Sequence, residues 1–266
     1  SLVPLTMPHV NIQLNKLTAI KLLLKSRSIL IRWEENFGKV ENTDWWHIIK
    51  DKEENLEDFS GNTRNQIRKG WKNYAAILTT RKDIIDNAYN VYKSSFKRYK
   101  TSEPIFTKTH FQEMIKRLPE FTEFWKVYEI DNNSIVGFSE NIILNDACFY
   151  NNIWLNNDSI KKYSGYVLIH EMNKYYLNKN RLKYISDGTR SIKHDTNIHN
   201  YLIDKFKFKK IYSKLNLVYL PPIGSIISIL YNLKGLIKFL PSSISSRISI
   251  LLKQEQIRRA SLSNAP

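Results

Sequence analysis

The first half of the chain is dominated by hydrophobic residues at helical spacing, interrupted by two short apolar runs. Leu and Ile recur every three to four residues over 12–25, and the runs at 28–33 and 45–49 have the composition of strands. Three further helices are expected before the pattern changes, over 62–74 with Ser60 as its N-cap, over 83–99 and over 107–118.

Beyond residue 120 the pattern becomes that of strands joined by short polar turns. Residues 123–130, 134–144 and 147–155 are rich in aromatic and β-branched residues. Turn-forming residues at 131–133 and 145–146 separate them, which predicts an antiparallel meander.

Helices and strands alternate after the meander. A helix is predicted over 164–178, a strand over 182–186, a helix capped by Asp195 or Thr196 that ends near Phe206, and a strand over 211–220. This order predicts an α/β (α+β) fold, a mixed and largely antiparallel sheet with helices on its faces. We divide the chain into an N-terminal lobe with a basic helix (1–119), a central lobe (120–222) and a tail (223–266).

The tail carries a helical apolar stripe with Lys234 and Lys238 beside it. Pro241 should end this helix, and a second amphipathic segment covers 244–257, followed by a polar end at 261–266 that we expect to be disordered. Three interpretations stay open: the stripe packs on the domain, joins a partner helix, or lies in a membrane interface through residues 223–259.

Charge adds a preference for anionic partners. The chain has 41 Lys and Arg against 25 Asp and Glu, a formal net charge of +16. Lys-rich composition also occurs in proteins without any anionic partner, so the positive charge is equally compatible with a protein that binds nothing anionic. A single cysteine, Cys148, excludes an intrachain disulfide, and no signal peptide or spanning segment is evident. We expect a cytoplasmic protein, peripheral at most to the inner face of a membrane, of undetermined oligomeric state.

The densest polar cluster, residues 186–196, leads from a predicted strand into a helix. Ligands of open α/β sheets bind at such strand ends. Asp187, Arg190 and His194 are the catalytic candidates, with Gly188 and Ser191 as substrate-binding candidates. The alternative is structural: Gly188 closes a turn and Arg190 pairs with Asp187.

A second candidate is the predicted helix start at residues 162–166. Lys162, Ser164, Gly165 and Tyr166 would hold phosphate groups, because free N–H groups at a helix start favour anions. An ordinary helix cap explains them equally well. His170, further along the same helix, is better explained as a core or surface histidine than as a catalytic group.

The predicted basic helix places Arg64, Arg68 and Lys72 on one face. It can be a solvated face, a phosphate-binding face or an RNA-binding face, with Trp71 as a core anchor or a stacking partner. The sequence contains no metal-binding spacing of His and Cys, no P-loop and no nucleophile elbow. We therefore predict no metal.

Residues 28–220 resemble the GNAT superfamily of N-acyltransferases, in particular its FemAB-like branch. The resemblance rests on the element order from 123 to 220 and on the motifs at 60–70 and 186–191. It implies that the strand at 147–155 splays from the strand at 182–186, that the acyl donor lies where they separate, and that the helix at Ser164 faces the donor pyrophosphate. Asn152, Trp154, Arg64 and Arg68 are then further substrate-binding candidates.

The same resemblance leaves two donors open. Residues 161–167 contain one Gly, whereas the usual GNAT turn is richer in glycine; Fem-type enzymes also lack that turn and use aminoacyl-tRNA to extend peptidoglycan peptides. The resemblance thus implies an N-acyltransferase that uses acyl-CoA or aminoacyl-tRNA and acylates an amine of a sugar or peptide, in cell-envelope or surface-polysaccharide biosynthesis. The alternative is a non-catalytic RNA- or membrane-binding module on an acyltransferase-like fold.

Overall fold

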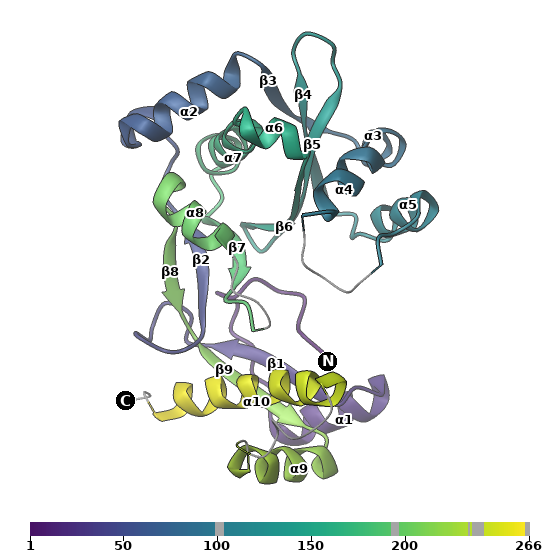
Figure 1. Cartoon of the computed structure of the whole chain (residues 1–266). Helices are drawn as coiled ribbons and strands as arrows, with labels where there is room; N and C mark the ends of the chain where they lie inside the picture. Colours follow the sequence, from purple (N-terminus) through teal and green to yellow (C-terminus); the bar gives the residue numbers. More distant parts are fainter. Residues whose placement is uncertain (99–103, 193–196, 234, 236–241, 264–266) are drawn as a thin grey trace. The chain divides into compact units, whose positions relative to one another are not determined.

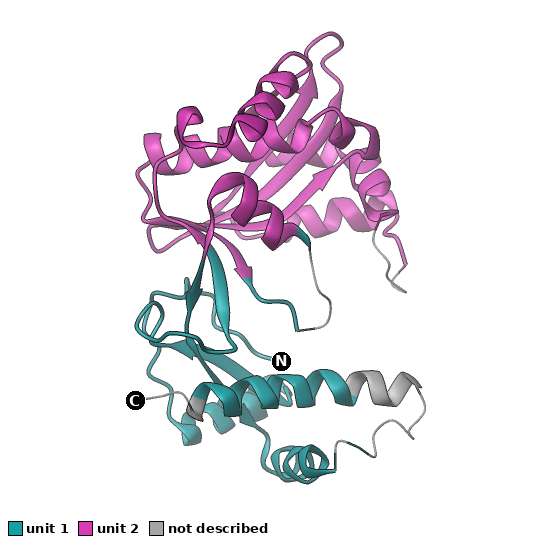
Figure 2. Ribbon diagram, turned by 60° about the vertical axis from the view of Figure 1, so that its left-hand side comes forward, with its two compact units in different colours: residues 1–48, 189–197, 210–266 teal, residues 49–188, 198–209 magenta. Residues whose placement is uncertain are grey.

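The computed structural model describes residues 1–98, 104–192, 197–233, 235 and 242–263. The chain forms two compact units, each built from separated stretches of sequence (Figure 2). Unit 1 comprises residues 1–48, 189–197 and 210–266, and unit 2 comprises residues 49–188 and 198–209.

A seven-stranded mixed sheet has the order β3-β4-β5-β6-β7-β2-β8, and its strands β3 to β6 lie wholly in unit 2 (Figure 1). β3 to β6 are antiparallel neighbours, and β6 and β7 are parallel. The strands are β3 (Tyr74–Thr79), β4 (Thr122–Glu129), β5 (Ile135–Leu144), β6 (Ala147–Leu155), β7 (Tyr184–Thr189), β2 (Trp46–Lys50) and β8 (Lys209–Tyr212). This sheet and its helices confirm the predicted α+β architecture.

The meander was predicted correctly because its turns have strong local signals. Asn133, Asn145 and Asp146 all have positive φ, between 50° and 60°, a conformation that Asn and Asp tolerate better than other side chains. The register then follows, with Leu144 opposite Ala147 across the second turn. Each strand thereby places its alternate apolar side chains on one face of the sheet.

One strand was missed. The basic helix α2 (Gly61–Trp71) ends three residues early, and Tyr74–Thr79 forms the edge strand β3 paired with β4. Ser60 caps α2 as predicted, its side chain accepting a hydrogen bond from the Thr63 backbone N–H.

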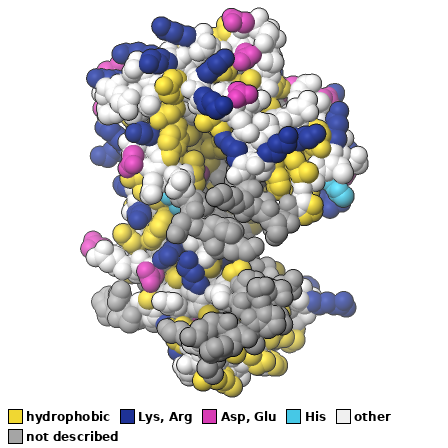
Figure 3. All heavy atoms as spheres, viewed as in Figure 1, with side chains coloured by type: hydrophobic (Ala, Val, Ile, Leu, Met, Phe, Trp, Pro, Cys, Tyr) yellow, Lys and Arg dark blue, Asp and Glu magenta, His cyan; other side chains and the backbone are white. Residues whose placement is uncertain are grey.

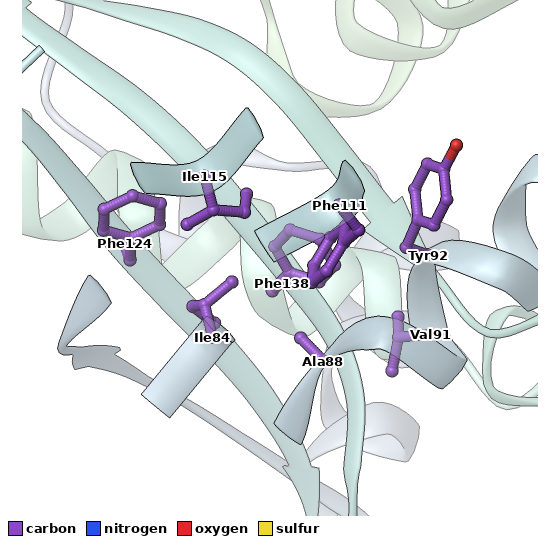
Figure 4. Packing of buried hydrophobic residues seen from close by; sticks show 8 residues of the cluster. All are labelled: Ile84, Ala88, Val91, Tyr92, Phe111, Ile115, Phe124 and Phe138. Carbon is purple, nitrogen blue, oxygen red and sulfur yellow. The ribbon is translucent and has the colours of Figure 1, made fainter. Parts of the chain in front are cut away.

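Helices α3 (Arg81–Asn87), α4 (Tyr89–Phe96) and α5 (Lys108–Lys116) cover one face of the sheet. The segment predicted as one helix over 83–99 is two helices, because Ala88 (φ −96°, ψ −1°) both ends α3 and precedes α4. The core beneath them combines aromatic and aliphatic side chains (Figure 4) and consists of Ile84, Ala88, Val91, Tyr92, Phe111, Ile115, Phe124 and Phe138.

The other helices of unit 2 are α6 (Asn157–Lys161), α7 (Ser164–Asn173) and α8 (Asn197–Phe206), which begins at the unit boundary. A π-helical turn, Lys174–Lys179, continues α7. Helices α2 and α7 approach closely at Gly70, where an added Cβ would lie 2.6 Å from the Val167 side chain and 2.8 Å from the Tyr163 carbonyl oxygen. Glycine is therefore required at this contact.

Unit 1 contains a two-stranded antiparallel sheet of β1 (Leu30–Glu35) and β9 (Lys214–Tyr219), with the helices α1 (Lys16–Ser26), α9 (Pro221–Asn232) and α10 (Ser242–Ser263). The strand predicted over 211–220 is two strands, β8 and β9, in different sheets. They are separated by the fully buried Ser213, whose backbone N–H donates to the Trp45 carbonyl oxygen.

The tail is more helical than predicted. α10 continues to Ser263, so residues 261–263 are not the disordered end we expected, and the Ser261 hydroxyl donates to the Ile257 carbonyl oxygen within the helix. Lys234, Lys238 and Pro241 lie outside the described residues.

Part of the tail packs on its own unit. Ile227 and Leu252 are buried against each other between α9 and α10, and Ile257 is buried with Leu30 and Trp45. Other members of the α9 stripe, including Ile226 and Leu233, stay exposed. Over the described residues, the structure contains no helix with the length and apolarity required to cross a bilayer.

Candidate active site

The strands β6 and β7 diverge toward their carboxyl ends. Their parallel pairing covers Ala147–Tyr184, Cys148–Ile185 and Phe149–Ser186, after which β6 continues to Leu155 and β7 to Thr189. The divergence that the GNAT resemblance implied is therefore present. Beyond the last pair, the backbone N–H and C=O groups on the facing edges of the two strands therefore do not bond to each other.

Asp187 lies at this divergence, one residue beyond the last pair of β7. The strand extends further than predicted, so Asp187, Gly188 and Thr189 are strand residues instead of a loop. Burial raises the pKa of the Asp187 carboxyl to about 8. A carboxyl group that titrates near neutrality can both accept and donate a proton during a reaction.

His199, on α8, is the ionisable neighbour of Asp187. Its Nε2 lies 3.5 Å from the Asp187 Oδ2, and both side chains are largely buried. His199, Leu202 and Phe206 form the buried face of α8. Sequence reasoning missed His199, although its place on the apolar face of an amphipathic helix directly after the polar cluster was a usable signal. The predicted His194 lies outside the described residues.

Tyr150, on β6, links Asp187 to a buried polar network. Burial, together with the neighbouring Cys148, Tyr176, Glu54 and Asp187, raises the pKa of its hydroxyl well above the usual value, so it stays protonated. The hydroxyl donates to the Asn173 Oδ1 at 2.8 Å.

Glu54 is the centre of that network and is completely enclosed. Its carboxylate lies 2.9 Å from the Lys50 Nζ and 3.0 Å from the His170 Nδ1, and it accepts a hydrogen bond from the Asn173 side chain at 3.3 Å. His170 is thus a buried structural histidine, in agreement with the core interpretation. A buried carboxylate is retained only when it is paired in this way.

Gly188 has the positive φ that we expected, +87°. A Cβ at this position would lie 3.2 Å from the Phe149 Cε2, so the ring of Phe149 packs closely against this glycine.

The substrate-binding candidates Asn152 and Trp154 both donate to the buried carboxylate of Glu140, at 2.8 and 3.1 Å. Asn151, at a β-bulge between β5 and β6, donates to the same group at 3.1 Å. Burial raises the pKa of Glu140 despite these three donors. The side-chain N–H groups of Asn152 and Trp154 are therefore engaged within the protein.

Arg190 and Ser191 belong to unit 1. The Arg190 Nη1 donates to the Asp44 backbone oxygen at 2.9 Å and lies 3.5 Å from its Oδ1. The ion pair between Arg190 and Asp187 that we considered as an alternative is wrong, since Arg190 pairs with Asp44.

The start of α7 is packed against its own unit. Ser164 is fully buried, and its hydroxyl donates to the Ser159 hydroxyl at 2.9 Å. An added Cβ on Gly165 would lie 3.0 Å from Leu155 and 3.9 Å from the Tyr201 hydroxyl. These residues do not fit a pyrophosphate seated on the backbone N–H groups of Ser164 and Gly165, because the protein itself covers them.

Other candidates remain accessible. Lys162 is exposed and Tyr166 is half-buried, with its ring 5.3 Å from that of Tyr201 on α8. On α2, Arg68 is exposed and Arg64 donates to the Glu57 carbonyl oxygen at 3.3 Å.

Trp71 is half-buried and donates to the Glu171 carboxylate, which supports its interpretation as a packing residue. Figure 3 shows Lys and Arg side chains scattered widely over one face of the molecule. No group of three or more His, Cys, Asp or Glu side chains within the described ranges is arranged to hold a metal ion.

Comparisons with known proteins support the fold. No family model matches the chain, and no curated protein matches its sequence. The crystal structure of FemX is similar, with a TM-score of 0.53 and 9% identity over 80% of this chain and 79% of that one. This likeness shows that the chain has the GNAT-like, FemAB-like fold that its motifs predicted.

Two further solved structures are similar at lower scores, which carry no argument of their own. The C-terminal domain of a protein described as a lysylphosphatidylglycerol synthetase, from Agrobacterium fabrum, has a TM-score of 0.47 and 8% identity over 77% of this chain and 71% of that one. An N-acetyltransferase from Sphaerobacter thermophilus has a TM-score of 0.41 and 11% identity over 72% and 60%.

Proposed function

We propose that this protein is an acyltransferase that moves an acyl or aminoacyl group from an activated donor to an amine of a sugar or peptide. The observation that carries the proposal is the position of Asp187. A buried carboxyl with a pKa near 8 lies beside His199, directly beyond the point where β6 and β7 diverge. Perturbed titratable groups at strand ends are typical of active sites.

Asp187 would be the proton acceptor. In the reaction the amine nitrogen attacks the donor carbonyl carbon, a C–N bond forms, and the bond to the leaving oxygen or sulfur breaks. The amine must lose a proton, and the deprotonated Asp187 carboxylate can take it. His199, 3.5 Å away, would orient the carboxylate and receive the proton in turn.

The diverging strands would supply the remaining requirement, stabilisation of the oxyanion. The edge of β6 beyond Phe149 has backbone N–H groups that β7 does not use. Such groups can bind the developing negative charge on the carbonyl oxygen and the amides of an extended donor. The packing at the start of α7 favours a donor that needs no pyrophosphate cradle there, such as aminoacyl-tRNA, over acyl-CoA.

A donor and acceptor screen tests the proposal. Purified protein is incubated with radiolabelled acetyl-CoA or aminoacyl-tRNA and a panel of amino sugars, nucleotide-linked amino sugars and peptidoglycan peptides. We expect transfer to at least one amine, lowered about 100-fold or more by Asp187→Asn. The exposed Asp146 offers the control Asp146→Asn, which should keep full activity.

Two results would contradict the proposal. Transfer that Asp187→Asn leaves unchanged would remove Asp187 from the reaction. Salt-sensitive binding of tRNA without any transfer would favour the non-catalytic RNA-binding alternative.

A further inference from the structure

Unit 1 contains a cavity of about 770 Å³ that the proposed reaction does not use. Its walls come from α1, β1, β9, α9 and α10, all within this unit. A volume of this size is typical of sites for small ligands or headgroups. Lys16, Trp33, Asn216, Ser225 and Arg258 show the mixed character of its lining.

The charged groups of the cavity leave an excess of positive charge. Lys16, Arg258 and Arg259 line it, against the single carboxylate of Glu255. Glu255 is 3% exposed and accepts from the Arg258 Nε at 2.9 Å and from the Arg259 Nε at 2.8 Å. One carboxylate thus holds two guanidinium groups in place, and their remaining N–H donors suit a phosphate.

An unpaired amide points to the same kind of ligand. The Nδ2 of Asn216, a residue that lines the cavity, is buried and has no hydrogen-bond partner within the described part of the chain. A buried donor without a partner is costly, and an acceptor oxygen from a ligand would satisfy it.

Helix α9 adds an exposed apolar edge to this cavity. Gly224, Ser225, Ile227 and Ser228 line the cavity, and Ile227 is also buried against α10. At 100° per residue, Ile226 lies on the side of the helix opposite the cavity, and Ile229 lies next to Ser225 at the edge of the cavity face. These two side chains are 53% and 59% exposed.

Helix α1 repeats this arrangement on another wall. Lys16 and Ile20 face the cavity, whereas Leu23 is buried in the core. Leu17 and Leu24 follow the cavity face around the helix, on the side away from the core, and are 74% and 63% exposed. Leu17 and Leu24 on α1 and Ile229 on α9 therefore lie beside the cavity-lining faces of their helices and are exposed. Figure 3 shows hydrophobic side chains at the end of unit 1 where Figure 1 places α9.

We propose that this cavity binds the phosphate of an anionic phospholipid at a membrane surface. Lys16, Arg258 and Arg259 contact the phosphate, Asn216 donates to it, and the apolar edges of α1 and α9 enter the interfacial layer. Charge complementarity and the exposed apolar side chains beside the cavity together favour a lipid, since a soluble anion needs only the charges and a protein partner needs no cavity with a basic lining.

Vesicle co-sedimentation of the full chain tests this proposal. Vesicles of neutral phosphatidylcholine are compared with vesicles that contain 30% phosphatidylglycerol, at fixed ionic strength. We expect at least tenfold tighter binding to the anionic vesicles. Ile226→Asp with Ile229→Asp should weaken it at least tenfold, whereas Ile77→Asp with Ile130→Asp, the same change at exposed positions of unit 2, should change it less than twofold.

The cavity is tested by Lys16→Gln with Arg259→Gln, which removes two charges and should weaken binding about thirtyfold. Lys52→Gln with Lys97→Gln removes two charges from exposed positions of unit 2 and should have little effect. Circular dichroism confirms that each variant is folded.

Four outcomes would overturn the proposal. Equal binding to neutral and anionic vesicles would exclude the headgroup. Equal losses of vesicle affinity in the cavity variant and its control would show that the net positive charge, and not the cavity, determines binding. Competition by inorganic phosphate with no effect of the α9 variant would identify a soluble anion, and an α9-dependent dimer by light scattering would assign the apolar edges to a second copy. None of these readouts depends on acyl transfer.

Discussion

Replacing Asp187 by Asn should change the way stability depends on pH. In the native protein, burial raises the pKa of this carboxyl from 3.8 to about 8. Between these values the native state holds a proton that the unfolded chain has lost. The contribution of Asp187 to stability is therefore complete below pH 4 and disappears as pH rises through 8. Asn keeps the shape of the protonated group and has no such titration.

The size of the effect follows from the shift. Each pH unit between the unfolded and the native pKa is worth about 1.4 kcal/mol, so wild type should lose about 4 kcal/mol between pH 4 and pH 7 through this group. The stability of Asp187→Asn relative to wild type should grow by that amount over this range and level off above pH 8.

Urea unfolding of both proteins from pH 4 to pH 9 measures this difference, and other titrating groups cancel in the comparison. Asp146→Asn is the matched control, since Asp146 is exposed. The difference in unfolding free energy between this variant and wild type should not change with pH. A flat difference for Asp187→Asn as well would show that Asp187 titrates like an exposed carboxyl, and the reasoning about its burial would fail.

Two further substitutions test the packing of unit 2 by urea unfolding. Gly70→Ala forces a Cβ to within 2.6 Å of Val167 and should cost about 1–3 kcal/mol, whereas Gly61→Ala, with nothing within 4 Å, should be neutral or slightly stabilising; equal effects would contradict the close contact. Glu54→Gln leaves the buried Lys50 without its counter-charge and should cost about 3–5 kcal/mol; a loss below 1 kcal/mol would show that this ion pair is not essential.

Local patterns predicted the elements whose signals lie within a few residues. The meander over β4 to β6 has alternating strands and Asn-rich turns, so its order and turns were correct. The edge strand β3 follows directly on a basic helix; the predicted helix ran to Tyr74, the first residue of β3, and residues 75–79 were assigned to no element. The break at Ser213 depends on a backbone hydrogen bond to Trp45, distant in sequence, and no local pattern reports such a bond.

Candidate site residues could be predicted from the sequence only where the residue type and its place next to a predicted strand already suggested a function. Asp187 and Gly188 became candidates because a carboxylate and a glycine follow an apolar strand, and the structure places both at the end of β7. His199, Tyr150 and Glu54 were missed because burial and long-range contacts, not spacing, give them their properties.

The pH dependence of kcat/KM for the transfer reaction tests the central claim most directly. If Asp187 is the proton acceptor, the rate for wild type should rise with an apparent pKa near 8, and the residual rate of Asp187→Asn should lack that rise. The same rising limb in both proteins would show that another group takes the proton, and would contradict the assignment of this strand end as the active site.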